Sequence, residues 1–411
     1  MFKYLLLCYA SLLVTKTEAA DWNQFRGPLA DGHYEGAALP TEWGAAKNLV
    51  WKVKIPGLGW SSPITWKGKI YLTTAVPMDG ANNYSLRAIC VDFQTGSIDW
   101  NTEIFTEDGK TSPKPHGKNS HASPTPITDG SRLYVHFGHM GTAALNLDGS
   151  IFWKKDDLKY KPVHGNGGSP ILADNLLIYS IDGADQQCVV ARDIKTGVIR
   201  WKTDRKSQAP KKFSFSTPLY LKTGGREQII SPASGFVGSY DPKTGVELWR
   251  AKYPNDGYSV IPQPVFGHGL VYVSTSYDSA VLLAIKTNGK GNVPTTWSIK
   301  KGAPHTPSTL LVGNELYVLA DNGLFTCLDA TTSEVHYSER LPGGYSSSPI
   351  YANGLIYLTN ETGTGFVIAA GKEFKQISKN ELKERTFATF AAVDGSLIIR
   401  SDANLYRFQS R

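Results

Sequence analysis

The chain of 411 residues is poor in the features that mark small secreted domains and membrane proteins. Its four cysteines, at positions 8, 90, 188 and 327, are widely spaced and form no Cys-x-x-Cys pair, so the sequence predicts neither a disulfide framework nor a zinc site. Beyond the N-terminus no apolar run approaches the roughly 20 residues of a membrane helix, so we expect no transmembrane segment. Helix-like segments are few, and the best candidate is "SKNELKERT", residues 378–386.

The N-terminus has the layout of a secretory signal peptide. One early lysine precedes an apolar run from Tyr4 to Val14, and small residues follow, so we expect cleavage after Ala19 or Ala20. Cys8 lies inside the apolar run without the small residue that a lipoprotein signal places before its cysteine, so no lipid anchor is predicted. The mature chain, residues 21–411, is predicted to be periplasmic or secreted.

A repeat organises the mature chain. Each unit opens with a short apolar strand that follows a small residue and proline, continues through a Gly/Asn/Asp turn, and returns in a β-branched and aromatic strand. Examples are "SSPITWKGKIYLTT", "GSPILADNLLIYSI" and "SSPIYANGLIYLTN". This pattern predicts antiparallel strand pairs.

The second half of the unit repeats as well, as in "CVDFQTGSIDW", "ARDIKTGVIRW" and "SYDPKTGVELW". The Asp of this turn is expected to accept backbone N–H bonds, the Gly to take positive φ, and a fourth strand to end on an aromatic residue. The closing aromatics are Trp100, Trp153, Trp201, Trp249, Trp297 and Tyr337. Four strands in 40 to 50 residues are typical of a propeller blade.

An eighth unit supplies three strands, in "RTFATFAAVDGSLIIRSDANLYRF", before the chain ends. The missing outer strand is found near the N-terminus in "NLVWKVKI", where Trp51 occupies the closing aromatic position. We therefore predict one all-β domain, an eight-bladed β-propeller of four-stranded antiparallel blades, whose last blade is closed by an N-terminal strand.

The A-x-D-x-x-T-G-x-x-x-W pattern of these units resembles the pyrroloquinoline-quinone-like (PQQ-like) propeller repeat family, in the quinoprotein alcohol dehydrogenase-like superfamily. "DWNQFRGPLADG" is similar to the N-termini of a group of exported propellers. The family includes quinone-dependent dehydrogenases and a lipoprotein of the outer-membrane assembly machine, so the fold leaves the function open. The resemblance implies adjacent cysteines and a Glu, Asn and Asp calcium site for a dehydrogenase. This chain has no adjacent cysteines and we could place no calcium ligands, so no cofactor is predicted.

One mouth of the central channel is the predicted site. In a propeller, the segments before the inner strands share one face, and the loops between second and third strands open there too. Convergent polar and aromatic groups at such a concave place indicate a binding site. The candidates are Trp60, His116, Lys118, Asn119, His121, His139, His164, Asn166, Asp182, Asp185, Lys212, Phe213, Tyr258, His305, Tyr345 and Arg385. His136 and His139 are expected to approach His116 and His121.

Positive charge is concentrated in the connections that lead to this mouth. From each closing aromatic to the next inner strand they hold 21 Lys and Arg against 10 Asp and Glu, in a chain of formal net charge +7. We interpret the protein as a binding module for an anionic polysaccharide or an exported protein partner, and the predicted compartment argues against nucleic acid.

The alternative is an enzyme at the same mouth. A polysaccharide lyase or hydrolase would use His121 or His305 as the catalytic base, and a quinone-dependent dehydrogenase is the less favoured form of this alternative. The histidine spacings match no recognised metal signature, so no metal is predicted.

Overall fold

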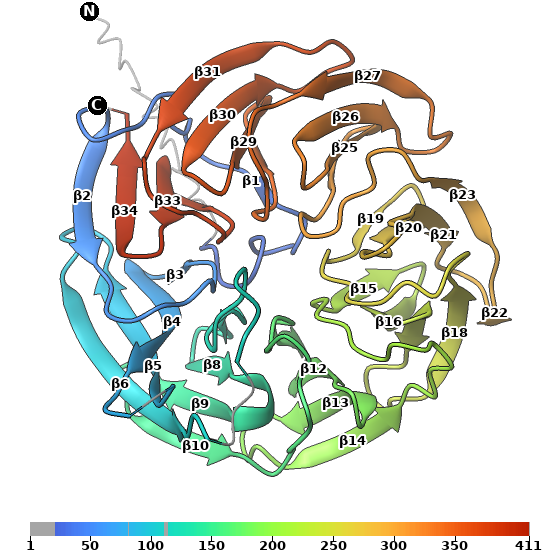
Figure 1. Cartoon of the computed structure of the whole chain (residues 1–411), viewed down its shortest axis with the longest axis horizontal. Coiled ribbons are helices and arrows are strands. Elements are labelled where there is room, and N and C mark those ends of the chain that lie inside the picture. Colours follow the sequence, from blue (N-terminus) through green and yellow to red (C-terminus); the bar gives the residue numbers. More distant parts are fainter. Residues whose placement is uncertain (1–20, 81, 111–113, 411) are drawn as a thin grey trace, which may run out of the picture.

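The computed structural model describes residues 21–80, 82–110 and 114–410, and the predicted signal peptide, residues 1–20, lies outside them. Eight sheets are arranged around a central axis (Figure 1). Each sheet contains the four antiparallel strands of one blade, which confirms the predicted eight-bladed propeller. Within the described residues the helical element is one short 3-10 turn, η1 (Gly138–Met140).

The first four blades follow one another along the chain, each from its inner to its outer strand. Blade 1 contains β3 (Ile64–Trp66), β4 (Lys69–Pro77), β5 (Tyr84–Asp92) and β6 (Ile98–Glu107). Blade 2 contains β7 (Ile127–Thr128), β8 (Arg132–His136), β9 (Thr142–Asn146) and β10 (Ile151–Lys155). Blade 3 contains β11 (Ile171–Ala173), β12 (Leu176–Asp182), β13 (Gln187–Asp193) and β14 (Ile199–Asp204). Blade 4 contains β15 (Leu219–Thr223), β16 (Arg226–Pro232), β17 (Phe236–Tyr240) and β18 (Glu247–Lys252).

The remaining blades repeat this order. Blade 5 contains β19 (Val265–Gly267), β20 (Leu270–Ser274), β21 (Leu282–Lys286) and β23 (Thr295–Ile299). Blade 6 contains β24 (Leu310–Val312), β25 (Glu315–Leu319), β26 (Leu324–Asp329) and β27 (Val335–Arg340). Blade 7 contains β28 (Ile350–Ala352), β29 (Leu355–Thr359), β30 (Thr364–Ala369) and β31 (Gln376–Glu381). Blade 8 contains β32 (Ala391–Val393), β33 (Ser396–Arg400), β34 (Asn404–Gln409) and β2 (Leu49–Lys54).

Strand β2 closes the ring as predicted. It pairs antiparallel with β34, with Lys52 opposite Tyr406 and Val53 opposite Leu405. In Figure 1 the blue β2 therefore lies beside the red β34. The edge that an open eighth blade would leave is paired within the chain.

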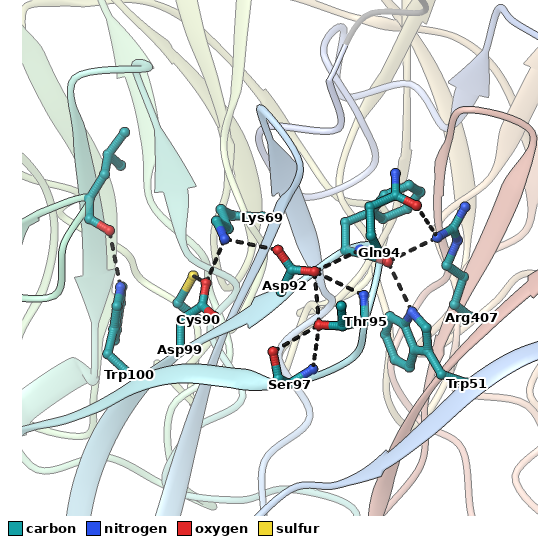
Figure 2. Close-up of polar contacts among 12 residues, drawn as sticks. Trp51, Lys69, Cys90, Asp92, Gln94, Thr95, Ser97, Asp99, Trp100 and Arg407 are labelled. Carbon is teal, nitrogen blue, oxygen red and sulfur yellow. Dashed lines mark hydrogen bonds and ion pairs between the residues drawn. The ribbon is translucent and has the colours of Figure 1, made fainter.

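The repeated Asp-x-x-Thr-Gly turn is held by its aspartate. The Asp92 Oδ1 accepts hydrogen bonds from the backbone N–H groups of Gln94 and Thr95, at 3.0 and 2.9 Å, and from the Thr95 hydroxyl (Figure 2). These bonds and the ion pair with Lys69 lower the pKa of Asp92 to about 2. Gly96 follows with φ of 75°, which favours glycine.

The closing tryptophans bind the turn of the next blade. The Trp51 Nε1–H donates to the Phe93 carbonyl at 2.9 Å, and the Trp100 Nε1–H donates to Leu147 at 3.0 Å (Figure 2). The same bond recurs from Trp153 to Ile194, Trp201 to Pro242 and Trp297 to Ala330. The repeated aromatic is thus an inter-blade contact, which explains its spacing.

The hydrophobic core lies between the faces of neighbouring blades. Between blades 1 and 2, for example, Ile64 and Leu86 pack with Leu133, Val135 and Leu145, all fully buried. Since each blade packs on a neighbour at both faces, its middle strands are buried along most of their length.

Three details depart from the sequence prediction. Residues 378–386 are not a helix, because residues 376–381 pair with β30 as the outer strand β31. Two unpredicted short strands, β1 (His33–Tyr34) and β22 (Gly291–Asn292), add in parallel to β28 and β18. Trp249 lies behind β22 and donates to the Gln228 Oε1, because blade 5 has no Asp-x-x-Thr-Gly turn to receive it.

Candidate functional site

Small hydroxyl residues join the blades around the mouth. At the start of six of the inner strands, a backbone N–H donates to the side-chain hydroxyl of the equivalent residue in the next blade. The bonds run from Ser62 to Thr125, Thr125 to Ser169 and Ser169 to Thr217, each at 2.9 Å. A second arc runs from Gln263 to Ser308, Ser308 to Ser348 and Ser348 to Thr389, at 2.9, 2.9 and 3.0 Å. These hydroxyl residues at the starts of the inner strands therefore build an inter-blade collar.

Inside this collar is a central cavity of about 290 Å³, near the lower end of the usual range for small-molecule sites. Every blade contributes to its wall. The lining residues are Phe25, Trp60, Ser62, His116, Lys118, Asn119, Ser123, Thr125, His164, Gly167, Ser169, Phe213, Phe215, Thr217, Tyr258, Ser259, Ile261, Tyr277, Thr306, Ser308, Ser346, Ser348, Phe387 and Thr389. No carboxylate is among these described residues.

The floor of the cavity is the N-terminal segment, residues 21–34, which we call the floor segment. It crosses the channel from blades 1 and 2 to blades 6 and 7. Backbone bonds join Trp22 to Thr65 at 2.8 Å and Asn23 to Thr128 at 3.0 Å at one end. At the other end the Tyr351 N–H donates to the Gly32 carbonyl at 2.8 Å, and Phe25 lines the cavity between these ends.

Arg26 anchors the floor segment to blade 6. Its side chain is fully buried, and its Nη2 donates to the Thr309 carbonyl of blade 6 at 2.7 Å. Burial lowers the pKa of Arg26 to about 10, so the guanidinium is charged at neutral pH, and its Nε and Nη1 make no hydrogen bond within the described residues. A buried cation of this kind favours negative charge nearby.

Two aromatic walls face one another across the cavity. On the side of blades 8 and 1, the Trp60 and Phe387 rings lie 4.6 Å apart, and the Arg385 guanidinium lies 5.0 Å from the Phe387 ring centre. On the side of blades 4 and 5, the Phe213 and Tyr258 rings are 5.4 Å apart.

Histidines occupy the side of blades 2 and 3. The His116 and His164 rings lie edge to face, with centres 5.6 Å apart, and His164 also contacts Phe213. The Lys118 backbone N–H donates to the His116 Nδ1 at 3.2 Å, so neutral His116 carries its proton on Nε2. Partial burial, and then His116, lower the pKa of His164.

Comparison with known proteins identifies the family. A sequence profile described as outer membrane protein assembly factor BamB matches residues 114–308 and 233–373, which together cover more than half of the chain. The chain belongs to this family of PQQ-like propellers. None of the curated proteins matches it in sequence.

Solved structures share the fold of this PQQ-like propeller at low identity. BamB from Moraxella catarrhalis matches with a TM-score of 0.60 and 13% identity, over 88% of this chain and 99% of that one. The computationally designed Ika8 protein matches with a TM-score of 0.56 and 11% identity, over 86% and 100%. A europium-containing methanol dehydrogenase matches with a TM-score of 0.48 and 11% identity, over 95% and 98%.

The structure brings several of the predicted site residues together. Trp60, His116, Lys118, Asn119, His164, Phe213 and Tyr258 all line the cavity of the PQQ-like propeller. Arg385 stacks on both rings of one aromatic wall, Trp60 and Phe387, without being part of the lining.

Other candidates lie outside the cavity. His121 is buried against Tyr84, with ring centres 4.8 Å apart, and His139 lies 3.4 Å from the Glu107 carboxylate. The expected group of four histidines forms only in part. His121 and His139 interact electrostatically, whereas His116 lies at the cavity and the His136 ring is buried against Tyr179.

The remaining candidates have structural partners. Asn166 accepts from the Tyr160 hydroxyl at 2.6 Å, Asp182 is buried with Arg205 at 2.7 Å, and Asp185 accepts from the Lys161 N–H. The His305 N–H donates to the Asp321 Oδ2, and Tyr345 is fully buried with its hydroxyl on the Pro342 carbonyl. Lys212 is half-buried outside the lining.

Sequence reasoning missed the hydroxyl collar and four aromatic rings, Phe25, Phe215, Tyr277 and Phe387. The collar was visible as the small residue of each Ser-Pro start. Phe25 stands in "DWNQFRGPLADG", where no repeat marks its place.

The residues do not fit a calcium-dependent quinone, the cofactor that the fold family implies. Cys90, Cys188 and Cys327 are buried in blades 1, 3 and 6, and burial raises each pKa to about 12. No group of three or more His, Cys, Asp or Glu among the described residues could hold a metal ion. Over the same residues, no helix is long and apolar enough to cross a membrane.

Proposed function

We propose that this PQQ-like propeller is an exported module of the cell envelope that binds an acidic polysaccharide in its central cavity. The observation that carries the proposal is the lining, which joins aromatic walls, a hydroxyl collar and basic groups without a carboxylate. The more general part of the proposal, that the protein is a propeller that serves as a binding module, rests on the family match.

The aromatic walls suit sugar rings. The apolar C–H face of a sugar stacks on an aromatic ring, and the opposed walls at Trp60 and at Tyr258 would contact both faces of one unit. Ser62, Ser308 and Ser346 add hydroxyl groups that exchange hydrogen bonds with sugar hydroxyls.

The charges suit an acidic polymer. Lys118 contributes a cation from blade 2, and Arg385 presents an exposed guanidinium at the opposite wall. A planar guanidinium pairs with carboxylate or sulfate through two parallel hydrogen bonds. Cations in a partly enclosed cavity are less screened than those on an open surface.

Binding is better supported than hydrolysis at this place. Glycoside hydrolysis uses a pair of carboxyl groups about the scissile bond, and none lines the cavity among the described residues. The proposed catalytic histidines, His121 and His305, are also outside the lining. A lyase remains the alternative, with His116 or His164 as the base.

A polysaccharide panel tests the proposal. Purified mature protein is titrated with polygalacturonate, heparin and neutral dextran, and calorimetry is read beside ultraviolet absorbance at unsaturated sugar ends. We expect acidic polymers to bind without product, and Phe213→Ala to weaken binding by about ten-fold or more.

The matched control for Phe213 is Phe152→Ala, an exposed aromatic on the outer rim of blade 2, which should bind like the parent. Equal affinity for dextran and for the acidic polymers would refute the acidic ligand. An increase in ultraviolet absorbance would show that unsaturated product forms, and would favour the lyase over the binding module.

A further inference from the structure

A short piece of chain crosses the mouth above the cavity. Residues 116–118 run from the blade 3 loop at His164 to the blade 7 loop at Glu361. Blades 3 and 7 are four apart in a ring of eight, so these loops lie on opposite sides of the axis. In Figure 1 the teal segment that precedes β8 reaches the middle of the disc. We call residues 116–118 the strap.

The strap is firmly held on the blade 3 side. The His116 N–H donates to the His164 carbonyl at 3.1 Å, and the Asn119 side chain donates to the same carbonyl at 2.9 Å. Asn119 is itself fixed by the Ser123 hydroxyl and by its own N–H on the His116 carbonyl. These hydrogen bonds fix the backbone at residues 116 and 119, so this side of the strap would act as the hinge of any movement.

The blade 7 side is held by side chains. The Lys118 Nζ lies 2.6 Å from the Glu361 Oε1, and the Ser346 hydroxyl donates to the same oxygen at 2.7 Å. The Lys118 and Glu361 side chains are 42% and 20% exposed. Ion pairs exposed to this degree contribute little stability, because water screens them and two long side chains lose freedom.

The two ends of the cavity therefore differ in strength. The floor segment is tied across the channel by backbone bonds, the buried Trp22 and the buried Arg26, whereas the strap meets blade 7 through an exposed ion pair. At the middle of the strap a Cβ on Gly117 would meet no atom within 4 Å, so the strap faces open space on that side.

We infer that the strap is a gate over the cavity, latched by Lys118 and Glu361, and that an acidic group of the ligand opens it by replacing Glu361 on Lys118. The inference rests on the proposed function for the identity of the ligand. The exchange of one carboxylate for a ligand carboxylate or sulfate conserves the ion pair, so opening needs no net loss of charge pairing. A neutral sugar cannot make this exchange, so the latch also selects for acidic polymers.

Glu361→Gln tests the latch. The amide removes the charge but keeps a hydrogen-bond acceptor for Ser346. We expect faster hydrogen exchange of the Gly117 and Lys118 amides, and two- to five-fold tighter binding of polygalacturonate and heparin, which is the size of effect that one surface ion pair gives. Dextran binding should be unchanged.

Glu42→Gln is the matched control, because Glu42 forms an exposed ion pair with Lys47 at 3.0 Å near the outer edge. It should change neither exchange at the strap nor affinity. Lys118→Gln, by contrast, should speed amide hydrogen exchange at the strap and weaken the binding of acidic polymers, because the ammonium group that would pair with the ligand is gone.

The outcomes separate the two proposals. Unchanged exchange at the Gly117 and Lys118 amides in Glu361→Gln would overturn the gate, and so would weaker binding of acidic polymers by that variant. Failure of every variant to bind any polymer would overturn the proposed function, whereas the exchange measurement would still report on the latch by itself.

Discussion

Gly96→Ala probes the contact that joins blade 8 to blade 1. Gly96 has φ of 75°, and an added Cβ would lie 2.7 Å from the Trp51 Cδ2. The backbone strain costs about 1–2 kcal/mol for an L residue, partly offset by about 0.4–1 kcal/mol from the restricted unfolded chain. Displacing the buried Trp51 ring adds about 1–3 kcal/mol of packing strain and about 1 kcal/mol for its hydrogen bond. We expect a total loss of about 3–4 kcal/mol.

Gly68→Ala separates the two contributions. Gly68 lies in the same blade with φ of 74°, and a Cβ there would meet no atom within 4 Å. Only the backbone cost of about 1 kcal/mol then applies. The free energy of unfolding in urea, followed by tryptophan fluorescence and circular dichroism, should differ between the two variants by about 2–3 kcal/mol. Equal losses would refute the docking of Trp51 as the reason for glycine in this turn.

Three further changes probe buried groups. Burial and then Arg192 lower the pKa of His136 to about 3. Below about pH 6.5 the unfolded chain therefore binds a proton at this histidine that the native state does not bind. The free energy of unfolding should then fall by about 1.4 kcal/mol for each pH unit below about 6.5. His136→Gln should remove that slope from urea titrations between pH 6.5 and 4. Asp182→Asn should cost about 3–5 kcal/mol, because the fully buried Arg205 loses its carboxylate, and an added Arg205→Met should restore part of the loss in thermal melts. Trp201→Phe should cost about 1 kcal/mol in the same melts by deleting the indole donor, and no loss would contradict the inter-blade role of that bond.

The repeat made most of the fold predictable. Its strands, turns and closing aromatics are local signals, and eight copies of them leave little choice of architecture. The closure by residues 49–54 followed from the missing strand of the last unit. The helix expected over residues 378–386 failed because Glu and Lys propensity there is overruled by pairing with β30.

The site was predictable where the repeat places it and not elsewhere. His164 and Tyr258 line the cavity because each lies in the connection that leads into an inner strand. Tyr345 occupies a similar position but turns into the core between blades, which no local pattern reveals.

The floor segment was invisible to the sequence. Its contacts join residues 43, 105 and 283 positions apart and follow no period. The strap was equally hidden, since Lys118 meets Glu361 across 243 positions.

The pairing of β2 with β34 sets the order in which parts of the fold can form during synthesis. Strand β2 is made early but has no strand partner until residues 404–409 exist, and the floor segment that precedes it waits for blades 6 and 7. Seven blades must therefore persist as an open ring, with one unpaired edge, before closure across the longest sequence separation in the fold. That last step makes assembly slow and leaves the open ring exposed to aggregation. Once closed, the ring can open only by detaching a chain end, so we expect unfolding to be slow as well.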